Sequence, residues 1–171
     1  GDFWRGAALA LEQENAAGGY RGKQFRLLPA WSDNPWKAGV LEVTRLVQQQ
    51  GAWAVLGGVD GTTTHLAVQL ALKSHFLLLS PGSTDPTADA ANVPWLFSVA
   101  PSDRAIVPLL AGVADRAGGR FAVLAGNDHD SHATLVELRR ALRLRPTGPS
   151  AVVEVAPEED VAEAVARVLA G

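Results

Sequence analysis

The residues best suited to chemistry lie in a Gly- and Thr-rich segment in the first half of the chain. It reads Gly57-Gly58-Val59-Asp60-Gly61-Thr62 and continues with two more threonines. Glycine lets a ligand approach the backbone closely, and the threonines would present N–H and hydroxyl groups at the start of a helix, where an anion is stabilised. The alternative is a tight turn capped by Thr62. The segment matches neither the phosphate-binding P-loop nor the Gly-x-Gly-x-x-Gly pattern of dinucleotide sites.

Two further polar segments follow later strands. Ser80-Pro81-Gly82-Ser83-Thr84 again concentrates small residues and hydroxyl groups, and together with the first segment it favours binding of a polar ligand. Residues 127–132 hold two His and two Asp, which invites a metal interpretation. The spacing of His129 and His132 across a helix start is poor for a metal, so we favour a polar loop in which Asp130 or Ser131 caps the helix.

Several classes of chemistry are excluded by what the 171 residues lack. There is no Cys, so thiol nucleophiles and Cys-ligated metals are ruled out. No Gly-x-Ser-x-Gly elbow occurs, and Ser80 has no His and Asp at a characteristic spacing. We therefore predict no catalytic residue, no metal, no cofactor and no enzyme activity.

The charge pattern argues against a nucleic-acid partner, because the net charge is -3. Arg139, Arg140, Arg143 and Arg145 form the densest basic run. A solvated helix face explains it better than a phosphate-binding patch.

The polar segments are positioned by alternating strands and helices. Hydrophobic periodicity and capping signals predict helices over 4–16, 35–47, 62–73, 131–144 and 158–169, with another opening at residues 101–103, and strands over 24–31, 53–56, 76–79, 95–99, 121–125 and 151–155. Residues 80–94 are predicted as a long loop. This order predicts an α/β fold with doubly wound parallel sheets and helices on both faces, in which ligands lie beyond the carboxyl ends of the strands.

Several segments, taken in order, resemble the type I periplasmic binding proteins, specifically the branched-chain amino acid and amide-binding, Leu/Ile/Val-binding-like branch. The resemblance rests on Asn15-Ala16-Ala17-Gly18-Gly19-Tyr20-Arg21-Gly22, on Asp33-Asn34-Pro35, on Ser80-Pro81-Gly82-Ser83-Thr84-Asp85-Pro86 and on Pro101-Ser102-Asp103. It runs from Gly1 to about Leu144. It implies a two-lobed fold that closes around a ligand.

The resemblance also implies a set of ligand-binding residues. These are Gly61 and Thr62 in the first loop, Gly82, Ser83 and Thr84 in the second, and Asp130 opposing them from lobe two. Amino-acid-binding members have Ser and Tyr where this chain has Gly61 and Asp130. An Asp in the cleft would suit a cationic or polyhydroxylated ligand.

By the same resemblance, the chain is incomplete at both ends. Residues 1–100 correspond to most of lobe one, whose first strand is missing, and residues 101–171 to the beginning of lobe two. Family members continue well past the position of Gly171. A lobe without its central strand would expose unpaired strand edges, from which we expect weak stability or pairing with another chain, such as a homodimer.

The function implied is that of an extracytoplasmic solute-binding protein in an ABC-type uptake system. Its partners would be a small polar ligand, such as an amino acid or amide derivative, and a membrane permease. Its location would be periplasmic or extracellular, with the signal peptide outside this chain. The alternatives are the ligand-sensing ectodomain of a receptor and, below it, an α/β enzyme.

Overall fold

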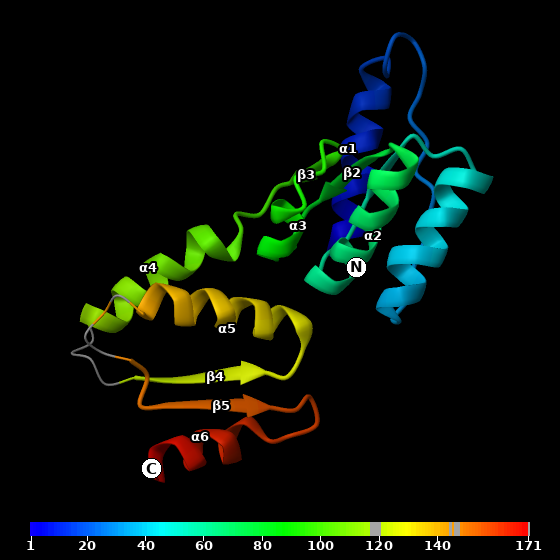
Figure 1. Ribbon diagram of the computed structural model, residues 1–171. Helices are drawn as coiled ribbons and strands as arrows, with labels where there is room; N and C mark the ends of the chain where they lie inside the picture. The colour runs from blue at the N-terminus through cyan, green and yellow to red at the C-terminus, as the bar shows by residue number, and fades with distance from the viewer. Residues whose placement is uncertain (117–120, 144, 146–147, 171) are drawn as a thin grey trace. The chain divides into compact units, whose positions relative to one another are not determined.

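The computed structural model describes residues 1–116, 121–143, 145 and 148–170, in two compact units, residues 1–31 and 32–171. The first unit begins with helix α1 (Asp2–Ala16) (Figure 1). Ala17 caps the end of the helix, and two glycines with positive φ follow it, Gly18 at 107° and Gly19 at 67°, so the helix stops at the Gly-Gly pair as predicted. A Cβ on Gly19 would collide with the carbonyl of Lys23, so this turn requires glycine.

The strand predicted over residues 24–31 is wrong, because no residue of that range lies in a strand. The side-chain amide of Asn15 instead holds this segment. It donates to the carbonyl of Phe25 at 2.9 Å and accepts from the N–H of Phe25 at 2.7 Å. The apolar character of residues 24–31 therefore does not distinguish a strand from an extended segment bonded by a side chain.

The second unit contains a three-stranded parallel sheet with the order β1 (Ala54–Leu56), β2 (Leu77–Ser80), β3 (Leu96–Ser98). Val55 pairs with Leu78, and Leu78 with Leu96. Helix α2 (Gly61–Ser74) packs on β2. The core around this sheet is made of short aliphatic residues and one Phe: Val43, Val55, Ala67, Val68, Ala71, Phe76, Leu78, Ala88 and Val93.

Two elements around this sheet differ from the predictions. The helix expected over 35–47 is present but is wound as two π-helical segments, η1 (Lys37–Glu42) and η2 (Arg45–Gln49). The predicted loop over 80–94 contains a short helix, α3 (Pro86–Ala90). Asp85 caps α3 and Pro86 occupies its first turn, so the sequence did carry a helix-start signal there.

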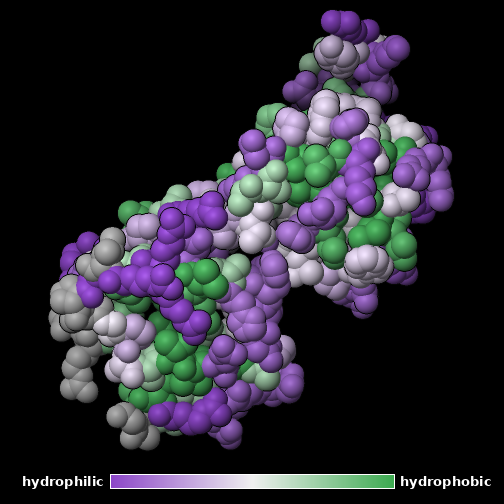
Figure 2. Space-filling model, in the orientation of Figure 1, coloured by the Kyte–Doolittle hydropathy of each residue, from purple (hydrophilic) through white to green (hydrophobic). Residues whose placement is uncertain are grey.

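The second unit also holds the parallel pair β4 (Ala122–Gly126) and β5 (Ala151–Val155). Helices α5 (His129–Leu142) and α6 (Val161–Ala170) pack on this pair, and α4 (Asp103–Arg116) packs on α5 (Figure 1). Hydrophobic side chains reach the surface over β4 and β5 (Figure 2). No helix in the described part of the chain is both long and apolar enough to cross a membrane.

Candidate functional site

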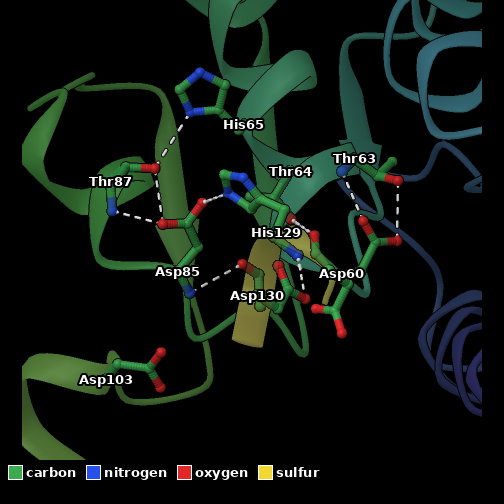
Figure 3. A network of polar contacts seen from close by, with 12 residues as sticks. Asp60, Thr63, Thr64, His65, Asp85, Thr87, Asp103, His129 and Asp130 are labelled. Carbon is green, nitrogen blue, oxygen red and sulfur yellow. Dashed lines mark hydrogen bonds and ion pairs between the residues drawn. The ribbon is translucent and has the colours of Figure 1, made fainter. Parts of the chain in front are cut away.

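The loops that follow β1, β2 and β4 meet within the second unit (Figure 3). A Cβ on Gly82 would lie 3.2 Å from the carbonyl oxygen of Val59, so the first two loops are in close contact. A Cβ on Gly61 would lie 3.0 Å from Cβ of Asp85 and would overlap Oδ1 of Asp130. The structure therefore brings Gly61, Gly82 and Asp130 to one place, as the position of loops at the carboxyl ends of parallel strands predicts.

Buried hydroxyl groups fix the loop between β1 and α2 from inside. The side chains of Thr64 and Ser80 are fully buried. The hydroxyl of Ser80 donates to the carbonyl of Gly58 at 2.8 Å. The hydroxyl of Thr64 shares its one proton between the carbonyl oxygens of Gly58, at 2.9 Å, and Asp60, at 2.7 Å. Gly58 has φ 76°, and a Cβ there would overlap the hydroxyl of Thr64. This glycine and these hydroxyls hold the loop in shape.

The caps of α2 and α5 are not the predicted ones. Asp60, rather than Thr62, caps α2 by accepting from the N–H of Thr63 at 2.7 Å. Asp128, rather than Asp130 or Ser131, caps α5 by accepting from the N–H of Ser131 at 2.9 Å. Hydrogen bonds from the backbone and hydroxyl of Ser131 hold the pKa of Asp128 below its ordinary value.

With Asp128 as the cap, Asp130 does not serve as one. The cap position is the residue just before the helix, whose side-chain oxygen accepts from the N–H of the second or third helical residue. Asp128 stands there and bonds to Ser131, whereas Asp130 already lies inside the first turn.

Asp85 is the most deeply buried carboxylate of the site, with its side chain fully covered. It accepts from the N–H and the hydroxyl of Thr87, both at 2.7 Å, and lies 2.9 Å from Nε2 of His129. Burial is the largest influence on the pKa of Asp85 and raises it, but the hydrogen bonds from His129 and Thr87 together outweigh burial and hold this pKa below its ordinary value. Asp85 thus fixes the ring of His129, whose side chain is 41% exposed.

Asp130 reaches the first loop from α5. Its Oδ2 accepts from the N–H of Gly61 at 2.9 Å. Its Oδ1 is buried and accepts no hydrogen bond from any residue that the structure describes. Burial raises the pKa of Asp130 above its ordinary value, and the carboxylates of Asp60 and Asp128 add to this, while the Gly61 hydrogen bond and His129 oppose it.

A third polar connection supports Asp130 from behind. The hydroxyl of Thr134 lies 3.0 Å from the carbonyl oxygen of Asp130 and 2.6 Å from Oδ2 of Asp103. Asp103 is buried, and its N–H donates to the carbonyl of Thr84 at 2.8 Å. The second loop, α4 and α5 are therefore joined through Asp103.

The other predicted binding residues lie in the same loops with mixed accessibility. Thr62 is the second residue of α2 and is partly buried, as is Thr84. Gly82 is exposed. Ser83 is buried, and its hydroxyl accepts from the N–H of Asp85 at 3.3 Å. The Ser83 hydroxyl is therefore engaged within its own loop.

No local pattern in the sequence singles out Asp85 and His129 as partners. The only local signal was the Asp-Pro-Thr order of a helix start, which identifies Asp85 as a cap. Its pairing with His129 joins residues 44 positions apart, which no short-range pattern encodes.

The arrangement does not assemble a metal site or a nucleophile in the part of the chain that the structure describes. No three His, Asp or Glu side chains there are placed to hold a metal ion. His129 pairs with Asp85 and His132 with Glu154, so the two histidines point to different partners. An Asp–His pair supplies two of the three members of a catalytic triad. The hydroxyl of Thr87 donates to Asp85 at 2.7 Å and lies 3.3 Å from Nδ1 of His65, and it does not bond to His129, the partner of Asp85.

The chain is similar to known binding proteins. A family model described as periplasmic binding protein matches residues 1–170. An amino acid binding protein from Pseudomonas aeruginosa is 33% identical over 101 residues, which are 59% of this chain and 27% of that protein.

Solved structures share its fold, and two of them are examples of what the chain is similar to. The branched-chain amino acid transporter substrate-binding protein from Streptococcus pneumoniae, in complex with isoleucine, gives a TM-score of 0.85 at 22% identity, over 99% of this chain and 49% of that one. An ABC transporter solute-binding protein from R. palustris, in complex with benzoate, gives 0.82 at 16% identity, over 95% of this chain and 46% of that one. The α/β fold with parallel sheets is confirmed, and the chain spans about half the length of these structures.

Proposed function

Because the chain belongs to the periplasmic binding protein family, we propose that it is part of a solute-binding protein of an ABC-type uptake system. Its ligand is a small polar molecule, such as an amino acid or an amide derivative, held between two lobes. Residues 1–100 belong to lobe one and residues 101–171 to lobe two. The partner is a membrane permease, and the location is periplasmic or extracellular.

One observation carries this proposal. Loops from strand ends of two separate sheets converge, with Gly61 and Gly82 on one side and Asp130 on the other. Closure of one α/β layer over another around a ligand uses such a junction. We assign ligand contacts to Gly61, Thr62, Gly82, Ser83, Thr84 and Asp130.

The chemistry of the loops favours a ligand with an anionic or amide end. In the first turn of α2, the N–H of Thr63 is bonded to Asp60 and that of Gly61 to Asp130. A ligand carboxylate that displaces Asp130 would gain the Gly61 N–H at this helix start. Isoleucine and benzoate, the ligands of two similar structures, both carry a carboxylate. Thr62 and Thr84 add hydroxyl groups that accept or donate hydrogen bonds.

A thermal-shift screen of the purified full-length protein tests the proposal. Matched sets separate the groups: leucine, leucinamide and 3-methylbutylamine in one set, and benzoate and benzamide in another. A ligand at one hundred times its Kd stabilises the folded state by about 2.7 kcal/mol, which corresponds to roughly 5–10 °C in Tm. If a broad panel of amino acids, amides, polyamines and small acids gave no shift, and one of them were turned over, the binding-protein assignment would be wrong.

Substitution of a threonine then tests the site. Thr62→Val removes one hydroxyl with little change of shape and is expected to raise the Kd of the identified ligand by roughly 2- to 10-fold. Ser74→Ala is the matched control, because Ser74 ends the same helix α2 and is exposed. Equal affinities for both variants and the unmodified protein would remove Thr62 from the site.

A further inference from the structure

The anion-attracting end of helix α2 is already occupied by a carboxylate of the same chain. Gly61 is the first residue of α2, so its N–H has no acceptor inside the helix. Oδ2 of Asp130 accepts this N–H at 2.9 Å, although the two residues lie 69 positions apart (Figure 3). The contact joins the loop after β1 to α5, which belongs with the other sheet.

The absence of a side chain at position 61 is what makes room for this carboxylate. A Cβ on Gly61 would overlap Oδ1 of Asp130 and lie 3.1 Å from its Cγ. The backbone at Gly61 is helical, so no left-handed conformation demands glycine there. Glycine at position 61 and Asp at position 130 are therefore a matched pair.

Neighbouring contacts hold Asp130 in position, but only one of its two carboxylate oxygens accepts a hydrogen bond from the described residues. The neighbouring residue on α5, His129, bonds to the buried Asp85, and Thr134 bonds to the carbonyl of Asp130. Two consecutive residues of α5 thus attach it to two loops of the first sheet. Oδ1 of Asp130, however, is buried without a donor among the described residues, which is unfavourable for a carboxylate.

We propose that Asp130 is an internal competitor, whose carboxylate fills the place at the start of α2 where an external carboxylate would bind and holds the loops of the two sheets together until a ligand displaces it from the Gly61 N–H. Once displaced, Asp130 contacts the ligand from the opposing side, as assigned above. The identity of the displacing molecule rests on the function proposed above. The occupied place itself rests only on the contact between Asp130 and Gly61.

Formate, the smallest carboxylate, tests whether a free carboxylate can bind at the start of α2. Asp130→Ala removes the carboxylate and leaves a space in which formate replaces the deleted atoms. In sodium formate, compared with sodium chloride at the same ionic strength, the Tm of Asp130→Ala should rise by roughly 2–4 °C and saturate. The unmodified protein should show no such rise, because its own carboxylate occupies the place.

Asp128→Ala is the matched control on the same helix. Asp128 is an exposed carboxylate that caps α5 and bonds to Ser131. Formate should not stabilise this variant beyond chloride. Equal stabilisation of both variants would mean a general effect of anions on helix ends and would overturn the proposal, as would no effect of formate on Asp130→Ala.

A second readout does not depend on the Tm of one variant. The ¹H–¹⁵N resonance of Gly61 should move in Asp130→Ala and return toward its original position as formate is added. If Asp130→Ala does not fold, Gly61→Ala and Asp130→Asn serve instead. Asp130→Asn keeps an acceptor oxygen, so the Gly61 resonance should stay near its original position. Relative to the unmodified protein, Gly61→Ala should lose more stability than Asp130→Asn. An unperturbed Gly61→Ala protein would refute the contact.

The outcomes separate this inference from the proposed function. Formate binding to Asp130→Ala needs no physiological ligand, whereas the ligand screen uses the unmodified protein. A ligand found in the screen without any formate effect would keep the binding function and reject the internal competitor. The formate effect without any ligand would do the reverse.

Discussion

Replacing Asp85 with Ala should destabilise the protein more than replacing any exposed carboxylate nearby. The Asp85 side chain is fully covered, caps α3 and accepts three hydrogen bonds, two from Thr87 and one from His129. Loss of a cap costs about 1 kcal/mol. Loss of a hydrogen bond to a charged group costs about 1–2 kcal/mol more, reduced here because His129 can turn to water.

The expected loss is therefore about 2–3 kcal/mol in the free energy of unfolding, or roughly 4–12 °C in Tm. Urea denaturation followed by circular dichroism measures it. Asp89→Ala is the control, because Asp89 lies in the same short helix and is exposed. That variant should change the free energy of unfolding by less than about 0.5 kcal/mol.

A double-mutant cycle isolates the contact between Asp85 and His129. His129→Ala alone should cost about 1–3 kcal/mol, since it leaves Oδ2 of Asp85 buried without that donor. In the double variant this penalty disappears. Its loss in the free energy of unfolding should therefore be smaller than the sum of the two single losses by about 0.5–3 kcal/mol. Strict additivity, or an Asp85→Ala variant as stable as Asp89→Ala, would refute this account of the site.

The remaining predictions concern pH and the first loop. Because the pKa of Asp85 is held below its ordinary value of 3.8, its contribution is complete above pH 3.8 and is lost as pH falls through the lowered value; urea titrations between pH 2 and 6 should show a steeper acid loss for the unmodified protein than for Asp85→Asn. The effect of pH on the contribution of Asp130 to stability is opposite in direction. Its pKa is raised, so the folded state binds the proton more tightly than the unfolded state does. Stability should therefore fall as pH rises above 3.8 until the raised pKa is passed. Asp130→Asn should abolish that decline, and an unchanged profile would argue against the burial of Asp130. Thr64→Val removes a fully buried hydroxyl from the carbonyl of Gly58 and should cost about 1 kcal/mol in urea denaturation, whereas Thr63→Val, at a partly buried position, should cost less; the reverse order would contradict the role given to Thr64.

The amino-acid sequence by itself determined the order of most strands and helices and the location of the polar loops. These features depend on neighbours within a few residues: apolar runs such as 54–56 and 77–79, a capping side chain such as Asn34, and glycines such as Gly18 and Gly19. Local patterns also placed Gly61, Gly82 and Asp130 in loops at strand ends. The parallel arrangement then followed from the alternation of elements.

Local patterns failed where a residue's partner is distant or where several residues compete for one role. Residues 24–31 have the apolar character of a strand, but the side chain of Asn15 bonds to the backbone of Phe25. Thr62 and Asp130 are acceptable caps by type, yet Asp60 and Asp128 stand at the positions that reach the free N–H groups.

Only the tertiary structure decided that Asp130 meets Gly61 and that His129 meets Asp85. Each pair joins the start of α5 to a segment at the end of another strand, across 69 and 44 positions of sequence. The energy of such a contact depends on burial, on the missing Cβ of Gly61 and on the donors left over at a helix start. Burial, the space beside Gly61 and the donors at the helix start are all set by the folded arrangement of these segments, so a local sequence pattern does not encode them.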